Sequence, residues 1–131
     1  MPKALLAACL LLALFTAAPL HAQSADFVVG FTWEGTESCF DPESPPFTLQ
    51  GVPAGTARLV FEMKDLDSPN FPHGGGIVEF KGQSAVPRGA FSYKGPCPPA
   101  GQHSYQWTVR AEDAKGTVLA ISQVMRKFPP R

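Results

Sequence analysis

The sequence has no excess of charge of either sign and no pattern typical of a long helix. Its 131 residues include 11 basic and 11 acidic side chains, which gives a formal net charge of zero. Nucleic-acid-binding domains generally carry a basic patch or stripe, so we expect no nucleic acid as a partner. The chain also lacks internal repeats, heptads and a convincing amphipathic helix, so neither a repeat array nor a coiled coil is expected.

The patterns that mark common hydrolytic and zinc sites are also missing. The histidines and aspartates that follow the strands could supply metal ligands, but no close pair such as His-x-x-x-His occurs. Ser68 and Ser104 lack the glycine pattern of a nucleophile elbow. We therefore expect a protein that is not an enzyme and has no metal or other cofactor, and a hydrolase is the least favoured alternative.

The first 22 residues are typical of a secretory signal peptide. A basic start at Lys3 precedes an apolar run over 4–20, and small Ala22 suits the last position before cleavage. The run is short for a membrane anchor and no basic stop follows it, and too little of it precedes Cys9 for a lipoprotein cut. We expect a periplasmic or secreted protein, with no stable membrane span after cleavage and one domain over 23–131.

Proline and glycine are abundant, with 14 and 12 residues, and they divide the chain into short segments. Turn signals recur about every ten residues, as expected for an antiparallel sandwich. We predict an all-β fold, an antiparallel Greek-key β-sandwich with long Pro/Gly-rich loops and little helix. The predicted strands are 26–33, 57–65, 77–80, 90–93, 102–110 and 117–124, with a short extended segment at 45–49, a turn at 82–88 and a basic tail at 125–131.

One stretch, Gly95 to Tyr105, combines rigid turn chemistry with two ring side chains. Its three prolines fix φ and remove backbone donors, so this turn cannot be a helix interior or a central strand. The following residues alternate with period two, which places His103 and Tyr105 on one face of a strand. We therefore predict a stiff loop that leads into the wall of a small pocket.

Polar side chains also follow the strand 57–65, where Asp65 and Asp67 precede His73 and three glycines. A carboxylate can orient an imidazole, and successive N–H groups in a glycine-rich turn can bind an anion. These residues could therefore join His103 and Tyr105 in binding a small anion such as phosphate. The plainer interpretation is that each aspartate caps its turn and each histidine is an isolated surface residue.

Two cysteines, Cys39 and Cys97, lie outside the signal peptide. In an exported chain such a pair is more often a disulfide than two free thiols. A bonded Cys97 could not act as a thiolate nucleophile.

The chain resembles the phosphatidylethanolamine-binding protein family, also called the Raf-kinase-inhibitor-like family. The resemblance lies in Gly-Pro-Cys-Pro-Pro at 95–99 with Gly-x-His-x-Tyr at 101–105, Ser-Pro-Pro-Phe at 44–47, Gly-Val-Pro-Ala-Gly-Thr at 51–56 and Asp-Leu-Asp-Ser-Pro at 65–69. These blocks occur in the order found in the family and span roughly residues 38 to 110.

This resemblance implies a non-enzymatic β-sandwich protein with a small pocket for anionic groups, including phospholipid head groups. The residues that would line or support that pocket are Asp65, Asp67, His73, Pro98, His103 and Tyr105. A Cys39–Cys97 bridge would join two loops beside it. A protein partner is also consistent with the family, but kinase inhibition is not expected of an exported chain.

Two departures from the family pattern bear on this expectation. The segment from Pro69 to His73 is shorter than usual, and His73 is followed by three glycines instead of tryptophan and aliphatic residues. The chain after Arg110 is brief and lacks the helical region of longer members. We therefore expect a pocket that is more open or that no longer binds lipid head groups. The main alternative is an extracellular immunoglobulin-like or fibronectin-like interaction module, in which the His/Asp loops have no joint role.

Overall fold

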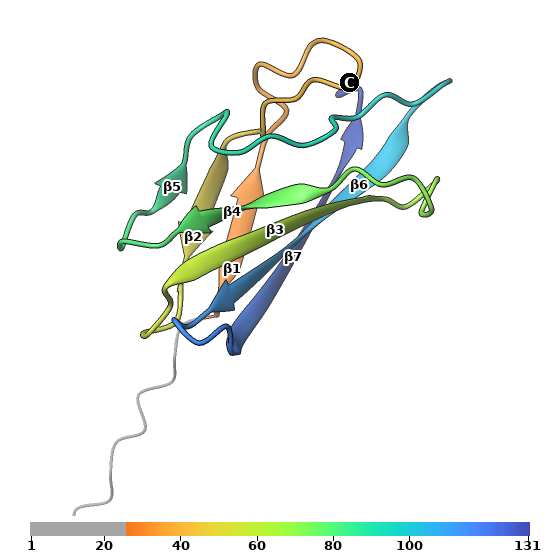
Figure 1. Ribbon diagram of the computed structural model, residues 1–131. Coiled ribbons are helices and arrows are strands. Elements are labelled where there is room, and N and C mark those ends of the chain that lie inside the picture. Colours follow the sequence, from red (N-terminus) through yellow and green to blue (C-terminus); the bar gives the residue numbers. More distant parts are fainter. Residues whose placement is uncertain (1–25) are drawn as a thin grey trace, which may run out of the picture.

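The computed structural model describes residues 26–131, and all regular secondary structure in that range is β (Figure 1). The predicted signal peptide, 1–22, lies outside the described residues. Within them, no helix is long and apolar enough to cross a membrane. The strands are β1 (Val28–Phe31), β2 (Phe47–Gln50), β3 (Arg58–Asp65), β4 (Gly75–Glu79), β5 (Ala85–Val86), β6 (His103–Glu112) and β7 (Val118–Phe128).

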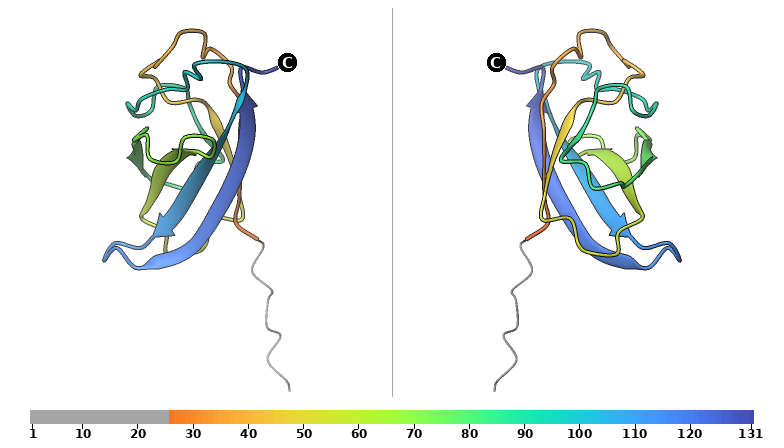
Figure 2. Two further views of the ribbon diagram at one scale, coloured as in Figure 1. Left: turned by 90° about the vertical axis from the view of Figure 1, so that its right-hand side faces the viewer. Right: turned by 90° about the vertical axis from the view of Figure 1, so that its left-hand side faces the viewer.

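The strands form two antiparallel sheets, which confirms the predicted all-β fold. The larger sheet has the order β4-β3-β6-β7 and the smaller one β1-β2-β5. The chain passes from β4 through β5 in the smaller sheet before it returns, so β6 pairs with β3 and not with β4. Figure 2 shows the long β6 and β7 strands side by side, with β1 running close to β7.

The core forms between the sheets because the strands alternate between buried and solvent-facing residues. In β3, Leu59, Phe61 and Met63 are buried, as the alternation predicts. Phe47 of the smaller sheet packs its ring 4.6 Å from that of Phe61 and 5.2 Å from that of Trp107 in β6. Each large apolar side chain buried in this way stabilises the fold by about 1.5–3 kcal/mol.

Hydrogen bonds also join the sheets near β1. The Val29 backbone N–H donates to the Ser122 hydroxyl oxygen at 3.0 Å, and the indole N–H of Trp33 donates to the Lys127 carbonyl oxygen at 2.9 Å. β1 and β7 are therefore joined although they belong to different sheets.

Three segments differ from the sequence-based prediction. The predicted turn 82–88 contains β5, which is only two residues long and pairs with β2. The predicted strand 90–93 is wrong, because only Ser92 forms an isolated bridge, with Glu43. The predicted tail is also wrong at its start, because β7 continues to Phe128 and pairs along the full length of β6.

The long loops gather at the end of the molecule where β3 and β7 finish and β6 begins. Figure 1 shows the loop between β1 and β2 and the loop before β6 at the same end as the C-terminus. A disulfide joins Cys39 in the first of these loops to Cys97 in the second, with a Cα–Cα distance of 4.7 Å. The disulfide expected from the two cysteines is therefore present.

Candidate functional site

The end of β3 and the start of β6 bring Asp65 and His103 together. Asp65 is the last residue of β3 and pairs with Tyr105, two residues into β6. The Nδ1 atom of His103 lies 2.7 Å from Oδ2 of Asp65, and the other carboxylate oxygen accepts the backbone N–H groups of Asp67 and Ser68 at 2.9 and 3.1 Å. Asp65 therefore closes the turn after β3 and orients the histidine across from it.

Asp65 is held as a carboxylate although it is only 4% exposed. Burial acts to raise its pKa, but the hydrogen bond and charge of His103 and the N–H groups of Asp67 and Ser68 outweigh burial and place the pKa below its usual value. An ionised carboxylate accepts the proton on Nδ1 of His103, so Nε2 is the ring nitrogen left for another partner.

His73 comes from the loop between β3 and β4 and is 3% exposed. Its Nδ1 lies 2.6 Å from the Lys94 carbonyl oxygen and therefore carries a proton, while its buried Nε2 has no partner within residues 26–131. The His73 ring lies 5.5 Å from the Tyr105 ring, edge to face. The structure thus brings His73 to the same cluster as Tyr105.

Tyr105 links the two histidines. Its ring lies 6.3 Å from the His103 ring, its side chain is fully buried, and its hydroxyl has no hydrogen-bond partner in the described part of the chain. Burial and the nearby negative charge of Asp65 raise the pKa of Tyr105 to about 12. The phenol therefore stays protonated at neutral pH and is available as a donor.

The two remaining predicted site residues hold the loops. Asp67 is exposed, and its Oδ2 accepts the backbone N–H of Ser104 at 2.6 Å, which ties the loop after β3 to the start of β6. Pro98 is half-buried and directly follows the disulfide-bonded Cys97. Neither contact pattern by itself identifies a ligand-binding role for these two residues.

Asp65, Asp67 and His103 also offer ligand atoms that lie within 4.8 Å of one another, the usual arrangement of a candidate metal site. The hydrogen bonds between Asp65 and His103 and between Asp67 and Ser104 account for this proximity. The internal hydrogen bonds therefore account for the closeness of the three side chains.

The predicted side chains meet, but of Asp65, His73, His103 and Tyr105 only His73 lines either of two neighbouring hollows. His73 and Phe71 line a hollow of about 490 Å³ beside β3, and Gln102 and Trp33 line another near the C-terminus. A single cavity lined by Asp65, His73, His103 and Tyr105 therefore stays a prediction.

Three residues near this cluster were missed in the sequence, and we call them the rim cluster: Phe40, Phe71 and Lys94. The Phe40 and Phe71 rings are stacked 5.7 Å apart, and the Lys94 ammonium lies 5.2 Å from the centre of the Phe71 ring. Their positions in the sequence could have indicated them, because Phe40 directly follows Cys39 and Phe71 precedes His73 by two residues. Aromatic side chains in loops beside a predicted site are natural candidates for ligand contact.

Comparison with solved structures identifies the fold. A phosphatidylethanolamine-binding protein homologue from Chlamydia trachomatis, CT736, superposes with a TM-score of 0.62 at 18% identity over 81% of this chain and 99% of its own. Escherichia coli YbcL, described as a member of the mammalian family, gives a TM-score of 0.62 at 17% identity over 82% of this chain and all of its own. The chain has the fold of the phosphatidylethanolamine-binding proteins. The resemblance found in the sequence is thus confirmed at the level of the fold.

Sequence comparison finds one curated relative, which covers only part of the chain. No protein-family model matches the chain. A UPF0098 protein from Methanothermobacter thermautotrophicus is 29% identical in an alignment that covers 60% of this chain. The chain spans 64% of the length of that relative.

Proposed function

We propose that this chain is an exported, non-enzymatic binding protein of the phosphatidylethanolamine-binding type, and that its Asp65–His73–His103–Tyr105 cluster binds a small anion such as a phosphate group. The export part of the proposal is supported by the basic start, the apolar run and the small residue before the expected cleavage point at Ala22. The binding part is supported by the fold and by the chemistry of the cluster.

The observation that carries the proposal concerns two buried atoms of the cluster, Nε2 of His73 and the hydroxyl of Tyr105, which have no hydrogen-bond partner within residues 26–131. Leaving such a group unsatisfied costs about 1–3 kcal/mol, so each gains from a ligand that completes its hydrogen bonding. A phosphate group offers oxygen acceptors for the Tyr105 hydroxyl. It also offers a P–OH proton for the neutral Nε2 of His73, or an oxygen acceptor if that nitrogen is protonated.

His103, which is half-buried, offers a third hydrogen-bonding group. Its Nδ1 is engaged by Asp65, and the carboxylate offsets the positive charge of the ring when both nitrogens carry protons. A protonated Nε2 of His103 can then donate to the anion. Asp65 acts in this scheme through His103, as a positioning residue.

The contacts of the cysteines support a binding role over catalysis. Cys39 and Cys97 are bonded to each other, so neither supplies a thiolate at the site. The Asp65 carboxylate already accepts three hydrogen bonds, which favours a fixed orienting role over one in proton transfer.

The alternative of an immunoglobulin-like module gave the His/Asp loops no joint role, whereas here they share the Asp65–His103 contact.

The experiment that tests the proposal is a phosphate titration of the mature protein with ¹⁵N-labelled histidine, followed by NMR of the imidazole nitrogens. Saturable shifts are expected at His73 and His103. Tyr105→Phe removes the hydroxyl and should weaken phosphate binding about 10-fold or more, the usual value of a hydrogen bond to a charged group. The control is Thr36→Val, which removes another buried hydroxyl that has no partner in the described part of the chain and should leave binding within about twofold.

Either of two results would contradict the proposal. One is the absence of a saturable shift at both histidines up to high millimolar phosphate. The other is an equal effect of Tyr105→Phe and Thr36→Val, which would place the anion elsewhere.

A further inference from the structure

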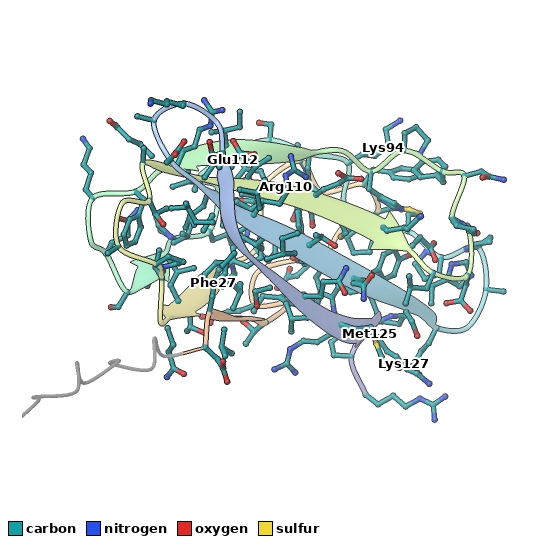
Figure 3. All side chains as sticks on the ribbon, turned by 90° about the horizontal axis from the view of Figure 1, so that it is seen from below. Phe27, Lys94, Arg110, Glu112, Met125 and Lys127 are labelled. Carbon is teal, nitrogen blue, oxygen red and sulfur yellow. A yellow bond between two sulfur atoms is a disulfide. The ribbon has the colours of Figure 1, made fainter. Side chains whose placement is uncertain are left out.

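The rim cluster is an exposed aromatic surface built from three separate loops. Phe40 is 45% exposed and Phe71 is 37% exposed, yet their rings stack at an interplanar angle of 17°. The Lys94 ammonium lies 5.8 Å from the Phe40 ring centre and 5.2 Å from that of Phe71. Figure 3 shows Lys94 apart from the Arg110 and Glu112 side chains. The Lys94 ammonium therefore contacts the two phenylalanine rings and is not part of the ion pair between Arg110 and Glu112.

The rim cluster is joined directly to the proposed anion site. The Lys94 carbonyl oxygen accepts the hydrogen bond from Nδ1 of His73, and the Phe71 ring centre lies 4.7 Å from that of His73. The residue before Phe40 is disulfide-bonded to Cys97, in the loop that leads to His103. A ligand held at His73 would therefore lie next to these rings.

Phe40 has an unfavourable backbone conformation as well as an exposed side chain. Its φ is 55°, in the left-handed region that glycine and asparagine adopt far more readily than a bulky aromatic residue. Burial of the side chain does not offset this strain, because nearly half of it is exposed. Residues held in such strained backbone conformations cluster at active sites and ligand-binding sites.

We propose that the rim cluster is a second subsite, which binds the apolar organic group of a phosphate monoester whose phosphate occupies the His73–His103 site. This inference rests on the proposed function and narrows its ligand to esters over inorganic phosphate. The two phenylalanine rings supply the apolar contact, and Lys94 supplies a positive charge beside the dianionic ester. An aromatic group can extend the existing ring stack, and an alkyl group can cover the same surface.

The test compares three esters of similar charge on the mature protein by calorimetry: methyl, hexyl and phenyl phosphate. The methyl ester reaches only the anion site, whereas the hexyl and phenyl esters also reach the rings. We expect the two larger esters to bind roughly three- to tenfold more tightly than the methyl ester, as one aromatic contact provides. A phenyl preference over hexyl would identify stacking, and equal affinities would identify simple apolar contact.

Phe71→Ala and Phe40→Ala should each reduce this preference to within about twofold, and with Phe40→Ala the methyl phosphate affinity should stay unchanged. Phe40→Ala is the cleaner variant, because Phe40 stacks on Phe71 whereas Phe71 also touches His73. The matched control is Ile77→Ala, which removes an exposed apolar side chain on β4 and should change nothing.

The outcomes separate this inference from the function on which it rests. Methyl phosphate binding without a preference for the larger esters, or a preference that survives both phenylalanine variants, overturns the subsite alone. Failure of all three esters to bind overturns the subsite and the anion site together.

Discussion

Removal of the Cys39–Cys97 disulfide should lower the free energy of unfolding by about 4 kcal/mol. The bond joins residues separated by 58 positions in the sequence. Closing a loop of that length removes about 14 cal/mol/K of entropy from the unfolded chain, which is about 4 kcal/mol at 25 °C. This is a large part of the 5–15 kcal/mol that typically stabilises a domain.

The native state should keep its shape without the bond, because other contacts hold the same loops. Arg88 bonds both the Asp41 carboxylate, at 2.7 Å, and the Gly35 carbonyl oxygen, at 2.9 Å. The Tyr93 backbone N–H donates to the Pro42 carbonyl oxygen at 3.0 Å. We therefore expect the stability change to act mainly through the unfolded state, with little change in the folded structure.

Urea unfolding, followed by the fluorescence of the buried Trp33 and Trp107, measures this effect with and without a phosphine reductant. A Cys39→Ala/Cys97→Ala variant should match the reduced protein and show no further response to the reductant. A loss smaller than about 1 kcal/mol in both experiments would refute the entropic reasoning, since loop closure over this distance cannot be so weak in an otherwise unstructured chain.

Three further predictions follow from individual residues. Burial raises the pKa of Tyr105 to about 12. The resulting contribution to the free energy of unfolding is fully present below about pH 10, and about 3 kcal/mol is lost as pH rises through 12. Tyr105→Phe should therefore flatten the alkaline limb of a stability–pH curve. The pKa of Asp65 is lowered, so its contribution is present above about pH 4 and is lost as pH falls further, and Asp65→Asn should flatten the acid limb. Gly74→Ala introduces a side chain at φ 75° in open space and should lower the free energy of unfolding by about 1 kcal/mol. Gly75→Ala should lower it by at least about 4 kcal/mol, because the new Cβ would overlap the Phe61 carbonyl oxygen. Urea unfolding measures both, and similar costs for the two variants would contradict this account.

The fold could be predicted where the sequence pattern and the environment coincide. The alternation of Leu59, Phe61 and Met63 identifies β3 because one face of that strand is buried and the other is solvated. The pattern fails at β5, where two residues among turn-forming ones become a strand only because β2 offers them an edge. It fails again at the end of β7, where pairing with His103 keeps Phe128 in the sheet despite the prolines that follow.

The site also has a part that could be predicted from the sequence and a part that could not. Asp65 and His103 lie at strand ends, and the antiparallel pairing of β3 with β6 places such ends side by side. His73 lies in an irregular loop, so its approach to Tyr105 depends on the Lys94 carbonyl group and is not visible in any local pattern. The stacking of Phe40 on Phe71 joins two such loops, and only the folded chain reveals it.

The shortened loop before β4 bears on whether the site can work. The more open pocket expected from the sequence stays a prediction, but His73 itself is only 3% exposed. The absence of a side chain at Gly75 lets the start of β4 lie against the backbone of β3 at Phe61. The Met63 backbone N–H then donates to the Gly74 carbonyl oxygen at 2.9 Å, which fixes the loop directly after the histidine. Gly75 thus allows a close approach of β4 to β3 that a bulkier residue would prevent. An anion that reaches Nε2 of His73 must therefore enter past the side chains around it, among which Phe71 of the rim cluster is the most exposed ring.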